Sequence, residues 1–579
     1  MKELLLGNEA VARGAFEAGA AVSSAYPGTP STEISEYLAK YDEVYAEWAP
    51  NEKVALETAL GASVAGARAM CAMKHVGLNV ASDPMFTASY TGVNAGLVIC
   101  VADDPGMHSS QDEQDSRHYA VAAKLPMLEP SDSAECLEFT KLAFDLSERF
   151  DTPVLLRLST RVSHSRSLAE TSPREERPLR EYKKDPMKYV MMPAMARGRH
   201  VAVEKRQQAL RAFAEGFGGN RVEYNGREIG VIACGISYNY AREALGERAS
   251  YFKLGMVNPI PDKAIKDFAA AVDTLYVVEE LDPVIETHCR ALGLDVIGKE
   301  RLPLIGELSS NIIREAILGT SPDILRPAEA LPQRPPVMCA GCPHRGVFFA
   351  LTQLKLTVSG DIGCYTLGAL NPIYGMDTCF CMGASIGVAH GMAKARGRES
   401  TSKTVAIIGD STFLHTGVPG LINVVYNKSA TTTIILDNSI TGMTGHQQNP
   451  ATGVTLKGEP THAVDLKLLC EAIGVKRVRV VDPFFVKEMR QALKEELAAD
   501  EPSVLIARRS CALLKSFQTF GKRYIDKEKC TECGLCLKIA CPAIMRADGK
   551  TFIDRAQCAG CTYCEGVCPS GAIGKYTQD

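Results

Sequence analysis

The chain has 579 residues, and its 64 Lys+Arg against 68 Asp+Glu give a net charge of −4. The 46 % hydrophobic and 23 % charged fractions are ordinary for a globular protein and exclude wholesale disorder. The near-neutral balance argues against nucleic acid as the main partner, and the absence of a long apolar run predicts neither a membrane span nor a signal peptide. The outlier is 20 cysteines, which are too sparse for a secreted disulfide scaffold and favour metal-binding thiolates in a cytoplasmic protein.

Short apolar strands alternate with Ala/Gly-rich helical stretches along most of the chain, which indicates parallel α/β sheets buried on both faces. We expect one such domain over residues 1–165 and a charged linker or surface excursion over 166–225. A smaller middle α/β domain is predicted over 226–330, ending at a proline-rich boundary, and a third α/β domain over 331–520. The tail, 521–579, is short, rich in cysteine and lysine, and internally repeated.

Several polar residues of the first domain are candidates for function. Glu52 opens a helix with an Ala/Gly face, and Glu57 is its rival; either one could equally be a surface glutamate. His75 either faces a substrate or is a core or capping histidine. The segment from His108 to Arg117 is too polar for the core, so we expect a loop, and its place after a strand end favours an active-site loop.

A thiamine diphosphate signature lies in the third domain. Gly409 and Asp410 follow one apolar strand, and Asn438 follows the next strand 28 residues after Asp410. In this pattern the Asp410 carboxylate, the Asn438 amide oxygen and the Ile440 carbonyl would coordinate the Mg²⁺ of a bound diphosphate, and Gly409 would let the backbone approach the phosphates. Ser411 stands where glycine is commoner, and ordinary strand-end turns are the alternative interpretation.

The tail contains two cysteine runs with iron–sulfur spacing. Each run has three cysteines separated by two residues and then a Cys-Pro, so the spacing predicts two [4Fe–4S] clusters with crossed fourth ligands. The spacing before Cys541 is four residues instead of the usual three, and a pair of zinc knuckles is the alternative, although the tail has no histidine. The tail resembles a bacterial two-cluster ferredoxin. The predicted ligand sets are Cys530, Cys533, Cys536 with Cys568, and Cys558, Cys561, Cys564 with Cys541.

Together these motifs resemble the 2-oxoacid:ferredoxin oxidoreductases along the whole chain, and most closely the large subunits of the branch that acts on indolepyruvate. Residues 26–31, Tyr-Pro-Gly-Thr-Pro-Ser, are similar to the family's Tyr-Pro-x-Thr-Pro-Ser substrate loop. Asn51-Glu52 followed by Gly61-Ala62-Ser63 matches the family's helix whose glutamate faces the thiamine pyrimidine ring, which favours Glu52 over Glu57 as the acid–base residue. The implied substrate contacts are Tyr26, Pro27, Thr29 and His75.

The same resemblance extends to the cofactor and to a third cluster. Residues 441–445 are similar to the family's segment after the Mg²⁺-binding asparagine. In many relatives a cluster beside thiamine is held by a Cys-x2-Cys, a cysteine some tens of residues later and one near the end of the domain. Unligated thiols, Cys379 and Cys381 as competing ligands, and a zinc site with His344 stay open. The implied residues are Ser411, Met443, Thr444 and Gly383 for the cofactor, and Cys339, Cys342, Cys364 and Cys511 for the cluster.

The resemblance implies pyrimidine-binding and diphosphate-binding thiamine domains, a middle domain like the transketolase C-terminal domain, and a two-cluster ferredoxin domain. It implies oxidative decarboxylation of arylpyruvates (indolepyruvate, phenylpyruvate, hydroxyphenylpyruvate), transfer of the acyl group to coenzyme A and one-electron reduction of ferredoxin. A smaller beta subunit and a dimer of large–small pairs are the implied partners. Two alternatives stay open: a non-oxidative 2-oxoacid decarboxylase or carboligase with a ferredoxin appendage, and an electron-transfer subunit with an inactive thiamine fold.

Overall fold

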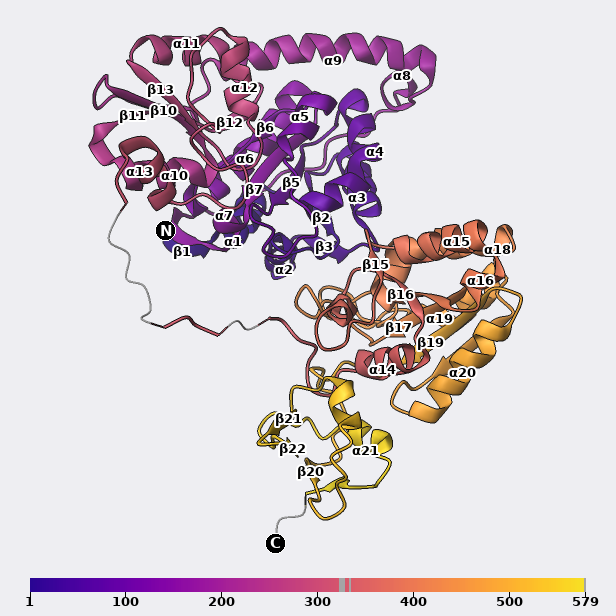
Figure 1. Cartoon of the computed structure of the whole chain (residues 1–579). Helices are drawn as coiled ribbons and strands as arrows, with labels where there is room; N and C mark the ends of the chain where they lie inside the picture. Colours follow the sequence, from indigo (N-terminus) through magenta and orange to yellow (C-terminus); the bar gives the residue numbers. More distant parts are fainter. Residues whose placement is uncertain (322–328, 333–334, 577–579) are drawn as a thin grey trace. The chain divides into compact units, whose positions relative to one another are not determined.

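The structure is a computed structural model of the chain, and it describes residues 1–321, 329–332 and 335–576. The chain divides into two compact units, Met1–Arg326 and Pro327–Asp579 (Figure 1). The proline-rich boundary predicted between the middle and third domains falls partly outside the described residues. Within the described residues, none of the helices combines the length and the apolar character that a membrane crossing requires.

The N-terminal unit contains a seven-stranded sheet in which only the short edge strand β12 runs antiparallel to its neighbour. Successive residues of the central strand β5 enter two different apolar cores, so both faces of the sheet are buried. This confirms the parallel α/β sheet predicted for the beginning of the chain. Across the sheet the strands are β3 (Tyr45–Trp48), β2 (Val22–Ala25), β4 (Ala69–Lys74), β5 (Leu97–Asp103), β7 (Val154–Ser159), β6 (Met127–Leu128) and β12 (Met256–Asn258).

Helices cover both faces of this sheet. Two of them begin at side chains that cap the free backbone N–H groups: the Asn51 side chain accepts the N–H of Val54 at 2.9 Å, and that of Asp132 accepts the N–H of Glu135 at 2.9 Å. The helices on one face are α3 (Glu52–Val64), α4 (His75–Thr91) and α5 (Arg117–Ala123); those on the other are α1 (Gly7–Glu17), α2 (Thr32–Leu38) and α6 (Ser133–Phe150).

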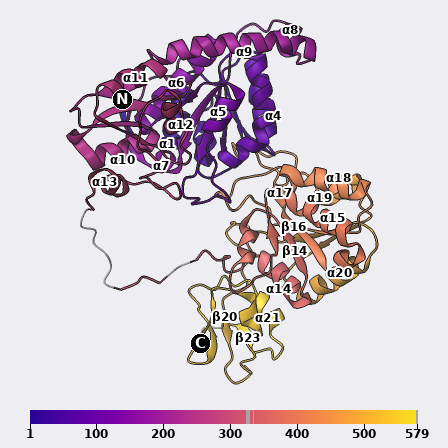
Figure 2. The same ribbon diagram turned by 45° about the horizontal axis from the view of Figure 1, so that its top comes forward.

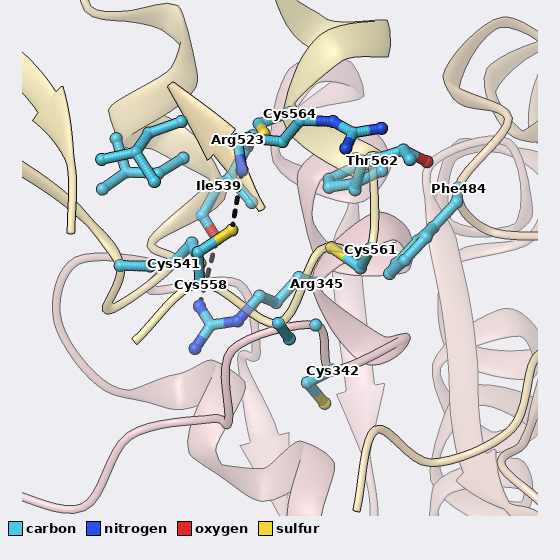
Figure 3. Close-up of a pocket in the computed structure, with 16 residues that line it drawn as sticks. Cys342, Arg345, Phe484, Arg523, Ile539, Cys541, Cys558, Cys561, Thr562 and Cys564 are labelled. Carbon is cyan, nitrogen blue, oxygen red and sulfur yellow. Dashed lines mark hydrogen bonds between the residues drawn. The ribbon is translucent and has the colours of Figure 1, made fainter. Parts of the chain in front are cut away.

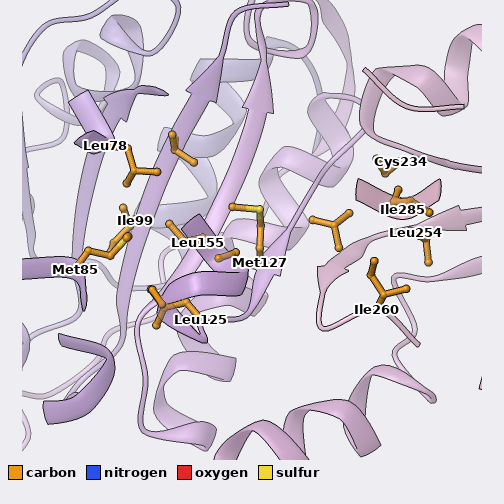
Figure 4. Packing of buried hydrophobic residues seen from close by; sticks show 14 of the residues in the cluster. Leu78, Met85, Ile99, Leu125, Met127, Leu155, Cys234, Leu254, Ile260 and Ile285 are labelled. Carbon is orange, nitrogen blue, oxygen red and sulfur yellow. The ribbon is translucent and has the colours of Figure 1, made fainter. Parts of the chain in front are cut away.

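The predicted middle domain forms a second, four-stranded sheet that shares its core with the first. Cys234, Leu254 and Ile285 belong to the same apolar cluster as Ile99 and Leu155 of the larger sheet (Figure 4). The N-terminal unit is therefore one packed body containing two sheets. The strands of the second sheet, in order, are β13 (Thr274–Val278), β10 (Ile229–Cys234), β11 (Ser250–Leu254) and β9 (Arg221–Glu223), of which β9 is antiparallel.

The charged segment between these two sheets contains more regular structure than a linker. Strand β8 (Arg166–Glu170) pairs antiparallel with β1 (Lys2–Leu6), and helix α9 (Pro193–Ala214) is 22 residues long. The Arg206 side chain, buried on α9, donates a 2.5 Å hydrogen bond to the carbonyl of Ser89 in α4. This contact attaches α9 to α4 and favours its helical conformation.

The C-terminal unit is built on a six-stranded, fully parallel sheet. Its central strands are again buried on both faces. Helices α14 (His344–Leu354) and α20 (Val486–Ala498) cover one face, and α15 (Ala384–Arg396), α18 (Val418–Tyr426) and α19 (Leu466–Ile473) cover the other. The strand order is β15 (Thr378–Cys379), β14 (Thr357–Gly360), β16 (Thr404–Gly409), β17 (Thr432–Asp437), β19 (Ser503–Arg508) and β18 (Arg477–Val481).

The cysteine-rich tail packs against α14 of the same unit (Figure 2). The Tyr563 ring stacks on Phe484 with ring centroids 4.7 Å apart, and Phe349 of α14 lies in the same apolar cluster. The tail therefore has little core of its own and is supported by the parallel-sheet domain. Its elements are the pairs β20 (Arg523–Ile525) with β23 (Ile573–Lys575) and β21 (Ile544–Ala547) with β22 (Lys550–Ile553), the 3-10 turn η4 (Leu535–Ile539) and helix α21 (Tyr563–Val567).

Candidate functional site

The two strand ends of the thiamine signature lie at one edge of the C-terminal sheet. Strands β16 and β17 are adjacent and parallel, with Gly409 paired to Leu436, so Asp410 and Asn438 emerge side by side. This confirms the prediction that both strand ends share one edge. In open parallel sheets, ligands bind at the carboxyl edge of the strands.

Asp410 is a buried carboxylate with one oxygen left without a partner. Its Oδ1 atom accepts the N–H of Ser411 at 2.8 Å, whereas Oδ2 has no hydrogen bond among the described residues. Burial, together with the nearby Asp437 carboxylate, raises the pKa of Asp410 to about 7. A buried, unsatisfied carboxylate oxygen is costly, and a bound cation would remove that cost, so this oxygen fits a Mg²⁺ ion.

The predicted cofactor residues Gly409 and Gly383 lie where the fold leaves no room for a side chain. A Cβ atom at Gly409 would come within 2.9 Å of the Tyr365 ring. Gly383 has a φ of +84°, donates its N–H to Asp361 Oδ1 at 2.8 Å, and has no room for a Cβ beside Thr416. Both positions require glycine, for space at the first and for backbone conformation at the second.

The loop after Asn438 contains the other residues predicted to contact Mg²⁺ or the thiamine cofactor. The Asn438 Oδ1 atom accepts the N–H of Ile440 at 3.3 Å, which orients the amide, and Ile440 itself is buried. The Thr444 hydroxyl donates to Gln447 Oε1 at 2.6 Å. Met443 is 51 % exposed, so its side chain makes little contact within this unit.

Glu52 is buried at the start of α3, whereas its rival Glu57 lies at the surface. Glu52 is 4 % exposed, and a Cβ atom at Gly77 of α4 would come within 2.6 Å of its Oε1 atom, so the missing side chain makes room for the carboxylate. Glu57 lies 3.9 Å from Lys53 in an exposed i,i+4 pair. The structure thus separates two glutamates that the helix pattern alone leaves equivalent.

The Tyr-Pro loop follows β2 at the carboxyl edge of the N-terminal sheet. Tyr26 and Pro27 are buried and Thr29 is half-buried. The Thr29 carbonyl accepts the hydroxyl of Ser109 at 3.2 Å, and the Ser109 carbonyl accepts the Lys74 ammonium at 3.0 Å. These contacts bring the predicted substrate loop and the polar segment after β5 together.

His75 joins the same group from the start of α4. It is 1 % exposed, its Nε2 atom lies 3.2 Å from the Asp112 carbonyl, and its Nδ1 atom is buried without a hydrogen bond among the described residues. A hydrogen-bond partner for Nδ1 would therefore have to be a bound molecule or a residue other than those that the structure describes. This arrangement leaves both the substrate and the core interpretation of His75 available.

The prediction that the whole segment from His108 to Arg117 is too polar for the core is wrong for its second half. Asp115 and Arg117 are buried and form an ion pair at 2.6 Å, and Arg117 also pairs with Glu279 at 2.5 Å. Arg157 adds pairs to Asp103 and Glu129, both at 2.7 Å. Charges from segments far apart in the sequence compensate one another, and this compensation permits the burial of a polar segment.

The eight tail cysteines line two separate cavities in the grouping that their spacing predicts. In the described part of the chain, no three Cys, His, Asp or Glu side chains are grouped to hold a single metal ion. The first cavity is lined by Cys530, Cys533, Cys536 and Cys568, and the second by Cys541, Cys558, Cys561 and Cys564 (Figure 3).

Four further thiols of the unit influence one another electrostatically. Burial, with the thiolates of Cys511 and Cys339, raises the pKa of Cys364 to about 11. Burial chiefly raises the pKa of Cys342 to about 12, with smaller contributions from Cys364 and Cys339. These are the four positions implied for a third cluster. Cys342 also lines the second cavity of the tail (Figure 3).

The competing residues are Cys379, Cys381 and His344, of which His344 lies two residues after Cys342. After burial, the main influence on the pKa values of Cys379 and Cys381 is the Asp361 carboxylate. The His344 ring is buried and packs edge-on against Tyr365, with centroids 5.8 Å apart. Burial lowers the pKa of His344 to about 4.

Comparison with known proteins gives the class first. Residues 13–214 match the family described as "Pyruvate flavodoxin/ferredoxin oxidoreductase, thiamine diP-bdg", and residues 361–507 match "Thiamine pyrophosphate enzyme, C-terminal TPP binding domain". Each match covers a sheet edge described above. The chain is therefore a thiamine-diphosphate-binding oxidoreductase.

Two relatives narrow this class. "Indolepyruvate oxidoreductase subunit IorA" of Archaeoglobus fulgidus is 42 % identical over 610 residues, covering 99 % of this chain and 97 % of that protein. The protein of the same name from Methanothermobacter thermautotrophicus is 42 % identical over 604 residues, with coverage of 99 % and 97 %. The chain belongs to this family, the alpha subunits of indolepyruvate ferredoxin oxidoreductase. Among solved structures, a 2-oxoglutarate:ferredoxin oxidoreductase from Magnetococcus marinus aligns with a TM-score of 0.47 and 17 % identity, over 55 % of this chain and 65 % of that one.

Proposed function

We propose that the chain is the large subunit of an enzyme that oxidatively decarboxylates arylpyruvates, with indolepyruvate as the first candidate. One arylpyruvate and one coenzyme A would give one aryl-acetyl-CoA, one CO₂, one proton and two electrons, which leave singly to ferredoxin. Full-length similarity to IorA subunits supports this choice. The observation that carries it is the placement of thiols in one unit: the Cys511 N–H donates to the Asn438 carbonyl at 3.0 Å, and Cys342 lines the second tail cavity.

The residues at the two sheet edges have distinct roles in this proposal. Asp410, the Asn438 amide oxygen and the Ile440 carbonyl would hold Mg²⁺ and the diphosphate. Bound thiamine diphosphate supplies a carbanion that attacks the keto carbon of the substrate. Glu52 would exchange a proton with the cofactor's pyrimidine ring, and its burial favours such a hydrogen bond over solvent contact. The loop of Tyr26, with His75 and Lys74, would orient the 2-oxoacid.

The thiols would then conduct the electrons. The Cys511 N–H donates to the Asn438 carbonyl at 3.0 Å, so this residue lies at the edge where the cofactor would bind. Cys342 borders both the Cys339–Cys364–Cys511 group and the second tail cavity. We infer a third cluster at these four thiols and two [4Fe–4S] clusters in the tail, which would give the electrons a stepwise route.

The partners follow from the chemistry of the products. Coenzyme A accepts the acyl group, ferredoxin accepts the electrons, and we propose a smaller beta subunit that completes the enzyme in a dimer of large–small pairs. All twenty cysteines are free thiols, which suits a reducing compartment and supports a cytoplasmic location.

An anaerobic assay tests the proposed function. The chain, purified with its small subunit, is mixed with indolepyruvate and coenzyme A, and reduction of ferredoxin or methyl viologen is followed by absorbance. We expect reduction that requires the 2-oxoacid. Glu52→Gln should lower the rate at least a hundredfold, because general acid–base groups typically contribute about 10²–10⁴. Glu57→Gln, at the surface of the same helix, is the matched control and should leave the rate unchanged.

Two outcomes would contradict the proposal. Viologen reduction that does not depend on a 2-oxoacid would remove the thiamine step. Release of CO₂ from indolepyruvate without reduction of any acceptor would favour the non-oxidative decarboxylase or carboligase instead.

A further inference from the structure

A buried arginine lies where the parallel-sheet domain meets the second tail cavity. Arg345, in the first turn of α14, is 3 % exposed. Its side chain lines the same cavity as Cys541, Cys558 and Cys561, and Figure 3 shows the guanidinium group directed toward Cys541 and Cys558. Neither the thiamine chemistry nor the ligand sets proposed above require this residue.

The guanidinium group donates four hydrogen bonds among the described residues, all of them to neutral acceptors. Its Nε atom donates to the Cys339 carbonyl at 3.0 Å, and its Nη atoms donate to the carbonyls of Met338, Ile539 and Ala540. Two of these carbonyls belong to the Cys339–Cys342 loop and two to the tail. Arg345 therefore ties the two thiol groups together through their backbones.

No carboxylate balances the charge of Arg345. Among the described residues it forms no ion pair, and Arg523, the other arginine of the cavity, pairs with Glu565. Burying a cation without a counter-charge is expensive in a protein interior. The cavity that Arg345 lines contains five thiols among apolar side chains, and thiols become anionic when they bind iron; they are Cys342, Cys541, Cys558, Cys561 and Cys564.

We propose that Arg345 is a positioning residue for electron transfer, whose buried charge is balanced by the thiolate-ligated cluster of the second cavity and makes that cluster easier to reduce. This rests on the proposed function, because it requires clusters in the tail. Adding one electron makes a cluster more anionic, and a fixed cation nearby stabilises that state. The same charge would also act on the Cys342 side of the cavity, where the electron arrives.

The test is a redox titration of the full chain, purified anaerobically with its small subunit and followed by low-temperature EPR. In Arg345→Gln we expect the reduced-to-oxidised ratio of one cluster to fall at least tenfold at a fixed potential. This corresponds to about 59 mV for a one-electron couple. Arg345→Lys keeps the charge and should stay within a few-fold of wild type. Arg555→Gln, which removes an exposed charge three residues before Cys558, is the matched control and should change nothing.

The outcomes separate this inference from the proposed function. Wild-type protein without reducible clusters would overturn both, whereas reducible clusters with an unchanged potential in Arg345→Gln would overturn the role of Arg345 alone. If Arg345→Gln loses iron, the comparison moves to iron content. Loss in the Gln variant with retention in the Lys variant supports a requirement for charge, and loss in both variants overturns it.

Discussion

Buried arginines in the two units are balanced in different ways. In the N-terminal unit, Arg117 and Arg157 lie among carboxylates: Arg117 pairs with Asp115 and Glu279, and Arg157 with Asp103 and Glu129. In the C-terminal unit, Arg345 is also buried, but it donates to backbone carbonyls, lines a cavity with thiols and apolar side chains, and forms no ion pair among the described residues. In the first arrangement, carboxylates of the chain balance the charges of the arginines. In the second, the charge of Arg345 is balanced only when the thiols are ionised.

This difference distinguishes a structural charge from a functional one. A buried ion pair with both partners present holds secondary-structure elements together. The ion pair of Arg117 with Glu279, the residue directly after β13, joins the first sheet to the second. A buried cation without an anion in its own chain indicates a ligand of opposite charge. The unbalanced charge of Arg345 therefore marks the second tail cavity as a ligand site, although much of the lining of that cavity is apolar.

The largest effect is expected from breaking the complete network. Arg117→Ala leaves Glu279 buried without an ion pair among the described residues and Asp115 with only the 3.7 Å contact to Arg157, which costs about 3–5 kcal/mol. We expect a large fall in the thermal midpoint of the full chain, or insoluble protein, measured by scanning calorimetry. The control is Arg290→Ala in the same unit. The Arg290 side chain is half-exposed, so its loss should shift the thermal midpoint little. A midpoint near wild type for Arg117→Ala would show that the network is not structural.

The second-largest effect is expected on the iron content of the second tail cavity, with the first cavity left intact. Cys564→Ser removes a thiol of the second cavity and should cost about four iron atoms per chain, the content of one cluster. Iron analysis with EPR measures this loss. Cys381→Ser, an exposed thiol outside the predicted ligand sets, is the matched control and should retain all iron. Equal iron in wild type and Cys564→Ser would contradict the ligand assignment.

The smallest effect concerns a carboxylate of the N-terminal unit that forms no ion pair among the described residues. Burial chiefly raises the pKa of Glu280 from 4.5 to about 7. The folded state then holds its proton more tightly than the unfolded state, so the unfolding free energy falls between about pH 4.5 and pH 7 and stays lowered above that window.

Glu280→Gln should therefore leave stability unchanged at pH 4 and raise it by about 1–3 kcal/mol at pH 8. Thermal midpoints at the two pH values measure this difference. The control is the exposed Glu300→Gln, which should show no pH-dependent gain. An equal gain at both pH values would mean that packing, rather than ionisation, governs the Glu280 site.

Much of the fold was predictable because strand ends and cysteine spacing are local signals. The apolar runs before Asp410 and Asn438 are enough to place both residues at a sheet edge, and the repeat of the tail is enough to group its thiols in two sets. The charge network was not predictable, because Arg117 and Glu279 lie 162 residues apart and only the folded sheets bring them together. The helix α9 was missed for a related reason: the charged segment around it favours a linker, and its contacts with α4 form only in the folded structure.

The candidate site divides in the same way. Glu52 and Glu57 occupy one helix, and only burial against Gly77 separates them. The environment of Arg345 depends on carbonyls from two segments almost 200 residues apart, which no local pattern reveals. Where chemistry depends on neighbours in sequence, prediction succeeded in naming candidates; where it depends on tertiary packing, the structure was needed.

The most direct test of the central claim is rapid-mixing EPR on the anaerobic holoenzyme with indolepyruvate as the sole reductant. We predict that reduced iron–sulfur signals develop in the wild-type protein, and that they are absent in Glu52→Gln and normal in Glu57→Gln. Consumption of indolepyruvate with release of CO₂ while every cluster stays oxidised would contradict the coupling of the thiamine site to the tail.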